Sequence, residues 1–259
     1  MAQPSYTLSA DGSRIAYQQT GNGPAILLLH GGGGSRRDWQ EAGYTAILQE
    51  HFTVVAMDLR GHGESDLPTD PASYAIALLV QDILAVADAC GVECFSLWGM
   101  SYGGKVGRYA VVERYAGAQS RRVERLVLMG TPLGLGVMGQ SRQMAIDFCA
   151  HWPPIVPAIQ DGSLEVKSLS QEDQATWQRI NVPVVTAWAW AMLDWPSVEP
   201  GDSFARRCGW WGLRTSRQSK AIDYTKKIYM TRRCRLISWK AWIICRCSKP
   251  SIACCRKLE

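Results

Sequence analysis

The chain lacks the features of a membrane or secreted protein. No uninterrupted apolar run reaches the roughly 18 residues that a membrane-spanning helix needs. The first residues, MAQPSYTLSADG, lack the basic start and apolar stretch of a secretory signal. Of the 259 residues, 47% are hydrophobic and 20% are charged, which is typical of a globular protein in water. We therefore expect a cytoplasmic protein of one domain with a modest insertion, and no membrane partner.

Histidine and acidic residues are scarce near the C-terminus. The four histidines are His30, His51, His62 and His151, so the sequence has no histidine after residue 151. Residues 1–203 hold 13 Lys and Arg against 21 Asp and Glu, a net charge of −8. Residues 204–259 hold 15 against 2, a net charge of +13, together with six of the nine cysteines. The end of the chain thus differs in composition from all that precedes it.

Two functional interpretations of this basic, cysteine-rich end are weak. Its clustered cysteines lack the paired C-x₂₋₄-C spacing of a zinc site, and no histidine lies near them: Cys245, Cys247, Cys254 and Cys255. Its basic residues form no organised stripe or known nucleic-acid motif, and disulfides are disfavoured in a cytoplasmic chain. We expect no metal, no cofactor and no nucleic-acid partner.

The first half of the chain alternates strand and helix patterns. Ser5–Leu8 and Ile15–Gln19 flank an Asp-Gly turn and predict a hairpin. Apolar runs predict four further strands, at Pro24–His30, Phe52–Asp58, Cys94–Trp98 and Val123–Met129. Apolar residues at helical spacing predict helices over Tyr74–Ala89 and Tyr102–Tyr115. In the helix over 74–89 we expect Asp82 and Asp88 on the polar face. This alternation predicts an α/β fold with a mostly parallel sheet covered by helices on both faces.

From residue 134 to about residue 200 the pattern changes to helices alone. Helical spacing covers Ser141–His151, Gln171–Arg179 and Pro183–Trp195, which are separated by prolines, and five tryptophans make the stretch unusually aromatic. An all-helical insertion after a sheet strand is typical of a lid over a pocket. We expect a core of residues 1–133 and 201–259 and a helical cap of residues 134–200.

The clearest chemical motif is Gly99-Met100-Ser101-Tyr102-Gly103, between an apolar strand and a helix. It fits the G-x-S-x-G pattern, in which a serine sits on a strained strand-to-helix turn and its neighbours two residues away must be small. The hydroxyl of such a serine projects above the sheet, and the N-terminus of the following helix favours developing negative charge. We predict Ser101 as a nucleophile, with a simple glycine-rich turn as the weaker alternative.

A second glycine run, His30-Gly31-Gly32-Gly33-Gly34, follows a predicted buried strand. Glycines let backbone N–H groups approach a substrate oxygen closely, as an oxyanion hole requires. We expect the N–H groups of Gly32 and Tyr102 to form this hole, with a flexible loop as the alternative. The substrate pocket is expected to include Gly31, Met100 and Trp188.

His62 lies in the turn Asp58-Leu59-Arg60-Gly61-His62-Gly63-Glu64-Ser65. Because the turn is tight, bracketed by glycines and upstream of the nucleophile, we expect a structural role for His62 rather than that of a catalytic base. For His30 we expect a role in bracing the glycine run.

The motifs HGGGGSRRDW, DLRGHGES and GMSYGG, in this order and spacing, resemble those of the α/β-hydrolase superfamily, and within it the small bacterial esterases and lactonases. The resemblance covers about residues 5–203. It implies a Ser–acid–His triad, with the acid after a late strand and the histidine near the C-terminus. Such a triad hydrolyses a small-molecule carboxylic ester through an acyl-enzyme on Ser101, and the aromatic cap favours a medium-sized or bulky apolar ester.

Several alternatives stay open within this resemblance. Lactone opening, C–C bond hydrolysis of diketones, amide cleavage and perhydrolysis use the same machinery, and a non-catalytic ligand-binding or inactive member of the fold is a different class. Serine at the elbow argues against dehalogenation, which uses aspartate in the similar fold. The oligomeric state is left open.

The sequence departs from the family pattern in its last quarter. The family's base would follow the cap, yet no histidine lies after His151, which sits beside Trp152 in the cap. No G-x-x-D turn after an apolar strand supplies the acid, and the available carboxylates, Asp194, Asp202 and Asp223, follow no convincing strand. Ser101 therefore lacks both triad partners in this chain as written.

Codon constraints suggest why. For residues 238–246 (SWKAWIICR), a reading that starts at the third base of each codon forces Glu and Asp after the two Trp codons and permits LEGLDHMQ. This string resembles the family's catalytic-histidine loop, and its histidine would straddle the codons of Ile243 and Ile244. Over Cys208–Thr215 the same frame permits WLVGSED, a strand that runs into a G-x-x-D turn. We hypothesise that residues 204–220 and 228–259 are translated out of frame.

The nucleotide sequence of the gene tests this hypothesis. We expect its third-base frame to encode histidine across the codons of Ile243 and Ile244, and an acidic residue within the frame that covers Cys208–Thr215. Any other residue at the histidine position would refute the frame hypothesis while leaving the elbow motif untouched.

Overall fold

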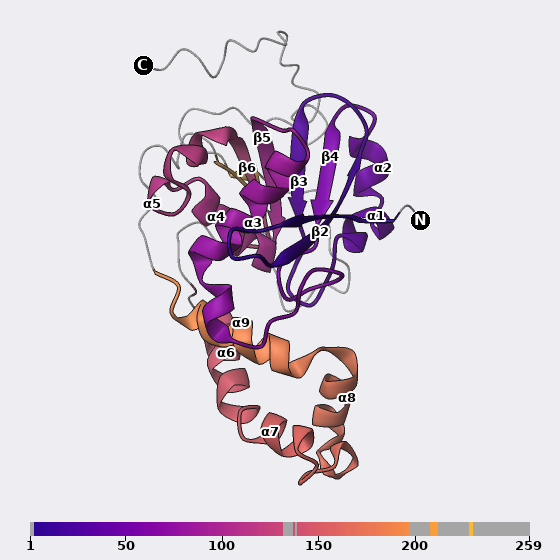
Figure 1. The fold of residues 1–259 in the computed structure, drawn as a ribbon, viewed down its shortest axis with the longest axis vertical. Helices are drawn as coiled ribbons and strands as arrows, with labels where there is room; N and C mark the ends of the chain where they lie inside the picture. The colour runs from indigo at the N-terminus through magenta and orange to yellow at the C-terminus, as the bar shows by residue number, and fades with distance from the viewer. Residues whose placement is uncertain (1–2, 132–136, 138, 197–207, 212–227, 230–259) are drawn as a thin grey trace.

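The computed structural model describes residues 3–131, 137, 139–196, 208–211 and 228–229, which form a sheet flanked by helices and a helical lobe at one end (Figure 1). The strands are β1 (Ser5–Leu8), β2 (Arg14–Thr20), β3 (Ala25–Leu29), β4 (Thr53–Met57), β5 (Phe95–Met100), β6 (Val123–Met129), β7 (Cys208–Trp211) and β8 (Ile228–Tyr229). Their order across the sheet is β1-β2-β4-β3-β5-β6-β7-β8. The six strands predicted from the sequence before the helical insertion are present, with ends that differ by at most two residues.

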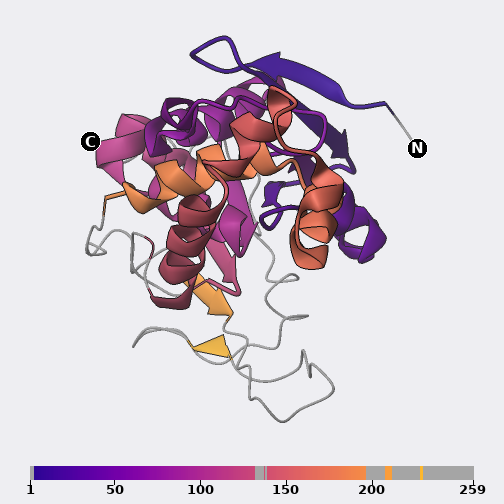
Figure 2. The ribbon, with the colours of Figure 1, turned by 90° about the horizontal axis from the view of Figure 1, so that it is seen from below.

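The middle of the sheet is parallel. Strands β4, β3, β5, β6 and β7 pair in parallel, whereas β1, β2 and β8 are antiparallel to their neighbours. The β1–β2 hairpin and the β7–β8 pair lie at opposite edges (Figure 2). The mostly parallel α/β sheet that the sequence predicted is confirmed.

Alternate side chains of the central strands enter two separate cores. In β3, Leu27 and Leu29 pack with α3 (Ile76–Ala89) and α4 (Tyr102–Ala110) on one face. Ile26 and Leu28 point to the other face and pack with Trp39 of α1 (Arg37–Glu41) and Leu48 of α2 (Tyr44–Leu48). A strand buried on both faces needs a continuous apolar run, because successive side chains point in opposite directions.

The helix predicted over Tyr102–Tyr115 is divided in the structure. α4 ends at Ala110, and a second helix, α5 (Glu113–Ala116), leads into the 3₁₀ turn η2 (Gly117–Arg122). Val112 between them is extended, with φ −103° and ψ 120°. Helical spacing alone did not reveal this break.

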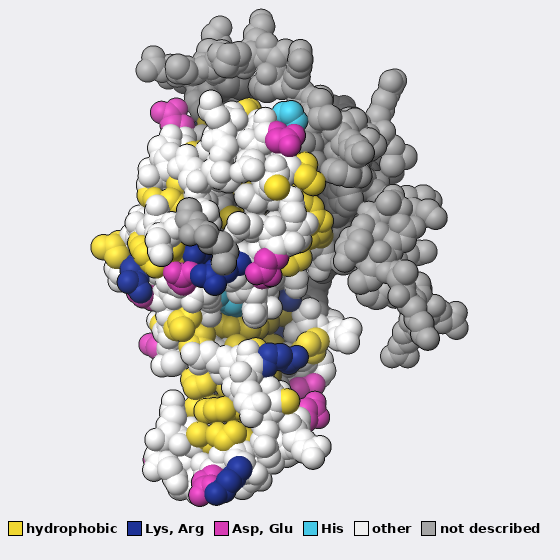
Figure 3. Space-filling view, turned by 90° about the vertical axis from the view of Figure 1, so that its right-hand side faces the viewer, with side chains coloured by type: hydrophobic (Ala, Val, Ile, Leu, Met, Phe, Trp, Pro, Cys, Tyr) yellow, Lys and Arg dark blue, Asp and Glu magenta, His cyan; other side chains and the backbone are white. Residues whose placement is uncertain are grey.

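The helical lobe comprises α6 (Gly139–His151), α7 (Ile155–Gln160), the 3₁₀ turn η3 (Val166–Ser168), α8 (Gln171–Arg179) and α9 (Val182–Leu193). The three helices predicted here are present, and α7 is an additional one. Ser170 caps α8 by accepting the Asp173 N–H, and Asn181 caps α9 by accepting the Val184 N–H. Hydrophobic side chains gather along the waist between this lobe and the sheet-bearing part (Figure 3).

α9 runs back from the lobe to the sheet-bearing part. It packs against α6 and against the 3₁₀ turn η1 (Pro71–Tyr74) that precedes α3. Trp195, just after α9, donates from its indole Nε1 to the Tyr74 carbonyl at 3.1 Å. The lobe is thus attached to the core through a buried tryptophan.

Most of the residues that we infer to be out of frame lie outside the described part of the chain. From 204–220 and 228–259 the structure describes only β7 and β8, the first of which extends the parallel sheet beside β6. Asp202, Asp223 and the Ile243–Ile244 pair are not among the described residues. In the ranges given above, no helix is both long and apolar enough to cross a membrane.

Asp82 corrects the predicted polar face of α3. Asp88 is exposed, but Asp82 is fully buried and pairs with the buried Arg60. The carboxylate accepts two hydrogen bonds, from Nε at 3.0 Å and from Nη2 at 2.7 Å, and Arg60 also pairs with Asp11. Helical periodicity could not show this, because the compensating charge comes from the turn after β4.

This pair predicts unequal effects of two substitutions on one helix. Asp82→Ala should lower the free energy of unfolding by about 3–5 kcal/mol, because it leaves a buried guanidinium without its main partner. Asp88→Ala is the control. Its exposed pair with Arg122 should be worth at most about 1 kcal/mol. Denaturant unfolding measures both, and similar losses for the two variants would contradict a structural role for Asp82.

Candidate active site

Ser101 occupies the sharp turn between β5 and α4. Its φ of 47° and ψ of −106° make it the one non-glycine residue with positive φ in the described part of the chain. Such a conformation costs on the order of 1–3 kcal/mol and persists only where its surroundings hold it. Ser101 is exposed, whereas Tyr102, Gly103 and Gly104 behind it are buried.

The two outer glycines of the motif allow this turn to pack closely. A β-carbon at Gly103 would lie 2.5 Å from the carbonyl oxygens of Leu29 and His30. A β-carbon at Gly99 would lie 2.6 Å from backbone atoms of Gly103 and Gly104. These contacts are with backbone atoms that cannot move aside, so the G-x-S-x-G spacing is a steric requirement of the turn.

Hydrogen bonds from three elements hold the turn. The Ser101 N–H donates to the Met129 carbonyl of β6 at 2.8 Å, and the Gly103 N–H donates to the His30 carbonyl after β3 at 3.0 Å. The Thr131 hydroxyl donates to the Ser101 carbonyl at 2.7 Å. Sequence reasoning missed Thr131, for which the only signal was its position just after β6.

The glycine run after β3 lies against the elbow. A β-carbon at Gly31 would lie 3.3 Å from Met100 Cε and 3.8 Å from Ser101 Cβ. One at Gly32 would lie 3.5 Å from Tyr102 Cβ and 3.7 Å from Cη2 of Trp188. The structure thereby brings together all six site residues that the sequence singled out, Trp188 coming from α9 of the helical lobe.

The backbone N–H of Tyr102 is suited to stabilise negative charge. Tyr102 is the first residue of α4, and the first N–H groups of a helix have no partner within it. The partial positive charge of the helix N-terminus adds to their effect. Gly32 lies beside Tyr102, so an oxygen atom bound above Ser101 would have both backbones within reach.

A cluster of aromatic rings closes the inner side of this site. The Tyr102 ring centroid lies 5.5 Å from that of His62, 5.0 Å from that of Trp188 and 5.8 Å from that of Trp195. Three buried polar atoms of the cluster have no hydrogen-bond partner among the described residues: His62 Nε2, Tyr102 Oη and Trp188 Nε1. Buried polar atoms of this kind usually bind water or a ligand.

His30 braces the backbone beneath the site. Its Nδ1 lies 2.7 Å from the Gly31 carbonyl, which can only accept, so Nδ1 carries the proton. Its Nε2 then accepts the Leu59 N–H at 3.0 Å. Burial lowers the pKa of His30 to about 4, so the ring is neutral at pH 7. It links the glycine run to the turn that holds His62.

His62 is also held neutral by its surroundings. Burial, together with the neighbouring His30, lowers the pKa of His62 to about 4. Its Nδ1 lies 3.1 Å from the Arg60 carbonyl, so Nδ1 donates and Nε2 is left as an acceptor. His62 thus belongs to the packed interior of the turn.

Asp58 organises that turn and its contact with α1. Its buried carboxylate accepts the Arg36 N–H at 2.6 Å and the Glu64 N–H at 2.8 Å, and it pairs with the Arg36 guanidinium. A β-carbon at Gly63 would lie 2.3 Å from the carboxylate. The motif DLRGHGES is therefore a structural turn that fixes the loop after β3.

The described residues do not supply Ser101 with a charge-relay partner. His151, at the end of α6, pairs through Nε2 with Asp173 of α8 at 2.8 Å, inside the helical lobe. Asp194 is exposed at the end of α9. Within the same described ranges no group of three or more His, Cys, Asp and Glu side chains could hold a metal ion.

The fold and the elbow place this chain in a known family. It belongs to the α/β-hydrolase fold family, whose model matches residues 24–176. An uncharacterized protein of Mycobacterium tuberculosis is 39% identical over 121 residues, which cover 46% of this chain and 32% of that protein. Epoxide hydrolase 3 of Siraitia grosvenorii is 30% identical over 103 residues, which cover 40% of this chain and 32% of that enzyme.

Solved structures show the same fold. An esterase from Exiguobacterium antarcticum superposes with a TM-score of 0.55 at 19% sequence identity, covering 74% of each chain. The matched segments span about a third of the length of the curated relatives named above. Relatives with different reactions share this fold, so the reaction must be argued from the site.

The steric fit of the elbow predicts contrasting effects of two alanine substitutions in α4. Gly103→Ala should lower the free energy of unfolding by at least about 1–3 kcal/mol, because the β-carbon of the new alanine would clash with two backbone carbonyls. Gly107→Ala is the matched control. Its nearest neighbour is the flexible Leu97 side chain at 3.2 Å, and alanine is the better helix former, so its effect should stay within about 1 kcal/mol. Equal destabilisation in thermal or denaturant unfolding would disprove the close backbone contact.

Proposed function

We propose that this protein is a serine hydrolase of small-molecule carboxylic esters that acts through an acyl-enzyme on Ser101. The observation that carries the proposal is the strained, exposed Ser101 beside the Gly31–Gly32 backbone, with the N-terminus of α4 directly behind it. Strain at an exposed nucleophile is retained where it serves chemistry.

The reaction follows from these positions. The Ser101 hydroxyl loses its proton to a base and attacks the ester carbonyl, and the N–H groups of Gly32 and Tyr102 stabilise the oxyanion of the tetrahedral intermediate. The C–O bond to the alcohol then breaks, the alcohol takes the proton, and an acyl-Ser101 ester remains. Water repeats the sequence and releases the acid.

Serine at the elbow favours a carbonyl substrate over the epoxides named for some relatives. Attack of a serine oxygen on an epoxide carbon would leave an alkyl ether on the enzyme. An ether has no carbonyl that water could attack, so the covalent intermediate would be a dead end. Attack on an ester instead leaves an acyl-enzyme that the same oxyanion hole can resolve.

Trp188 and Met100 give the proposed pocket an apolar lining. Trp188 reaches Gly32 from α9, and Met100 lies against Gly31, so acyl groups bound above Ser101 would contact aromatic and thioether surfaces. We propose that residues 134–200, which include the described helical lobe, act as the cap and favour medium-sized or bulky apolar esters. Lactones are the nearest alternative, since they present the same carbonyl.

Activity of this chain depends on a base and an acid. Neither accompanies Ser101 in the described part of the chain, and loss of triad members leaves a rate advantage over water of about 10³–10⁴-fold from the oxyanion hole and binding. We therefore propose that this chain hydrolyses esters slowly. Full activity would require residues 204–220 and 228–259 to be replaced by the amino acids that the third-base frame encodes.

Two protein forms test this proposal: the chain as it stands, and a chain in which those two stretches are replaced by their third-base translation. The restored chain should hydrolyse p-nitrophenyl butyrate several orders of magnitude faster and should react rapidly with a fluorophosphonate. The unaltered chain should label slowly or not at all.

Serine variants of the restored chain locate the nucleophile. Ser101→Ala should abolish both labelling and turnover, whereas Ser163→Ala, an exposed serine of the helical lobe, should change neither. Rapid turnover by the unaltered chain would mean that another residue supplies the base. Turnover retained in the Ser101→Ala variant would overturn the assignment of the nucleophile.

A further inference from the structure

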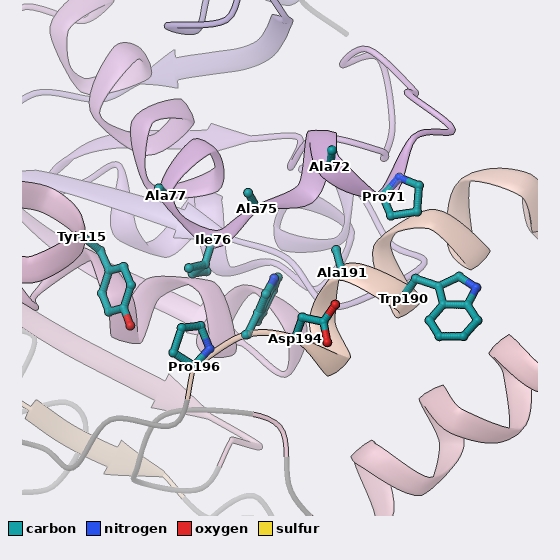
Figure 4. A pocket seen from close by; sticks show the side chains of 11 residues that line it. Pro71, Ala72, Ala75, Ile76, Ala77, Tyr115, Trp190, Ala191, Asp194 and Pro196 are labelled. Atoms are coloured by element: carbon teal, nitrogen blue, oxygen red, sulfur yellow. The ribbon is translucent and has the colours of Figure 1, made fainter.

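A cavity lies beside the C-terminal end of α9. It has a volume of about 570 Å³ and lies between η1, the start of α3, Tyr115 of α5 and the end of α9. Ser101, Gly32 and Trp188 are not among its lining residues. Its size is in the range of small-molecule sites, which hold about 300–1,000 Å³. Figure 4 shows Tyr115 and Pro196 at one end, Trp190 at the other, and Asp194 between them.

The walls of the cavity are apolar and partly aromatic. Trp190, Trp195 and Tyr115 contribute aromatic rings, and Ile76 and several alanines and prolines complete the surface. Trp190 is 44% exposed, although the neighbouring Trp195 is almost fully buried. The exposed Trp190 ring is therefore accessible to a ligand that enters the cavity.

Asp194 gives the cavity a negative charge. Of the described residues that line it, Asp194 is the only one with a charged side chain. It is also the C-cap residue of α9, the end of the helix at which the helix dipole carries partial negative charge. The nearby Arg142 donates to the Leu193 carbonyl at 2.9 Å and is not among the lining residues. Because Asp194 is the charge that a ligand in the cavity would contact, a cation is favoured over an anion there.

The cavity also contains a polar atom without a hydrogen-bond partner among the described residues. The Tyr115 hydroxyl is buried without a hydrogen-bond partner among the described residues. Two other polar groups of the wall have partners, since Tyr109 donates to the Pro196 carbonyl at 2.9 Å and the Trp195 indole donates to Tyr74. Asp194 and the Tyr115 hydroxyl are two groups of the wall that can interact with a polar ligand.

We propose that this cavity is a binding site for an organic ammonium ion with an apolar or aromatic body. The body would pack between Trp190, Trp195 and Ile76. The ammonium group would lie against Asp194 and the faces of the tryptophans, where cation–π attraction adds about 0.5–2 kcal/mol. The Tyr115 hydroxyl would accept a hydrogen bond from a primary or secondary ammonium. Anions are excluded by the carboxylate and the helix C-terminus, which together repel them.

The site is independent of the ester hydrolysis proposed for Ser101. Binding needs no reactive serine and no triad, so the Ser101→Ala variant should bind the same ligands. Trp195 nevertheless forms a common wall, because its ring lies 5.8 Å from that of Tyr102. Occupancy should therefore change the fluorescence of Trp190 and Trp195, which supplies a direct readout.

Three probes of the same shape and different charge test the proposal: benzylamine, benzyl alcohol and benzoate at pH 7. Calorimetric titration of the full chain should give a dissociation constant for benzylamine near or below about 1 mM, at least tenfold tighter than for benzyl alcohol, which corresponds to about 1.4 kcal/mol. Benzoate should not bind. Equal binding of benzylamine and benzyl alcohol, or tighter binding of benzoate, would overturn the proposal.

Variants then place the site. Asp194→Asn should weaken benzylamine binding about tenfold, by about 1.4 kcal/mol, and leave benzyl alcohol unchanged. Asp161→Asn is the matched control, because Asp161 is an exposed C-cap carboxylate of α7 in the same lobe. Tyr115→Phe should weaken benzylamine but not benzyltrimethylammonium, which has no N–H to donate.

Trp190→Ala should remove the fluorescence response and most of the binding. The four substituted side chains, Asp194, Asp161, Tyr115 and Trp190, are at least partly exposed. Circular dichroism of each variant is the control for folding. Binding that survives both Asp194→Asn and Trp190→Ala, or that falls equally with Asp161→Asn, would refute the assigned cavity.

Discussion

The close contact between the elbow and the backbone after β3 is the constraint on which the site depends. Gly103 lies so near the carbonyls of Leu29 and His30 that no side chain fits between them. This contact seats α4 on the sheet and places the first N–H of that helix beside the Gly31–Gly32 backbone. The unfavourable φ of Ser101 is maintained by the same packing, by the hydrogen bond that the Ser101 N–H donates to β6, and by the one that Thr131 donates to the Ser101 carbonyl.

Buried hydrogen bonds and ion pairs connect the segments around this contact. His30 connects the glycine run to the turn after β4, and Asp58 connects that turn to α1. Arg60, from the same turn, is paired with Asp82 of α3. Each link is a buried hydrogen bond or ion pair between segments far apart in sequence, and such links are costly to break because the remaining partner stays buried. The backbone that we propose to bind an oxyanion is therefore structurally well supported.

The packing around the elbow determines neither the base and acid that would activate Ser101 nor the substrate. The fold accommodates many reactions, and the relatives include both epoxide hydrolases and an esterase. Our proposal of carbonyl chemistry rests on the serine at the elbow, since an acyl-serine can be hydrolysed and an alkyl-serine ether cannot. The side of α9 that carries Trp188 faces the proposed oxyanion hole, while Trp190 and Asp194 face a different cavity. One helix thus separates two surfaces of different character.

The sequence by itself determined the order of the first six strands and of the longer helices, the elbow motif and the six residues predicted for the site, because apolar periodicity and glycine spacing are local consequences of backbone sterics. It also showed that no histidine follows His151. Only the tertiary structure decided that Asp82 is buried, that the helix after Ser101 breaks at Val112, that Thr131 holds the elbow, and that a cavity lies beside the end of α9. The burial of Asp82, the role of Thr131 and the cavity depend on segments distant in sequence, such as Arg60 for Asp82, so no local pattern could encode them.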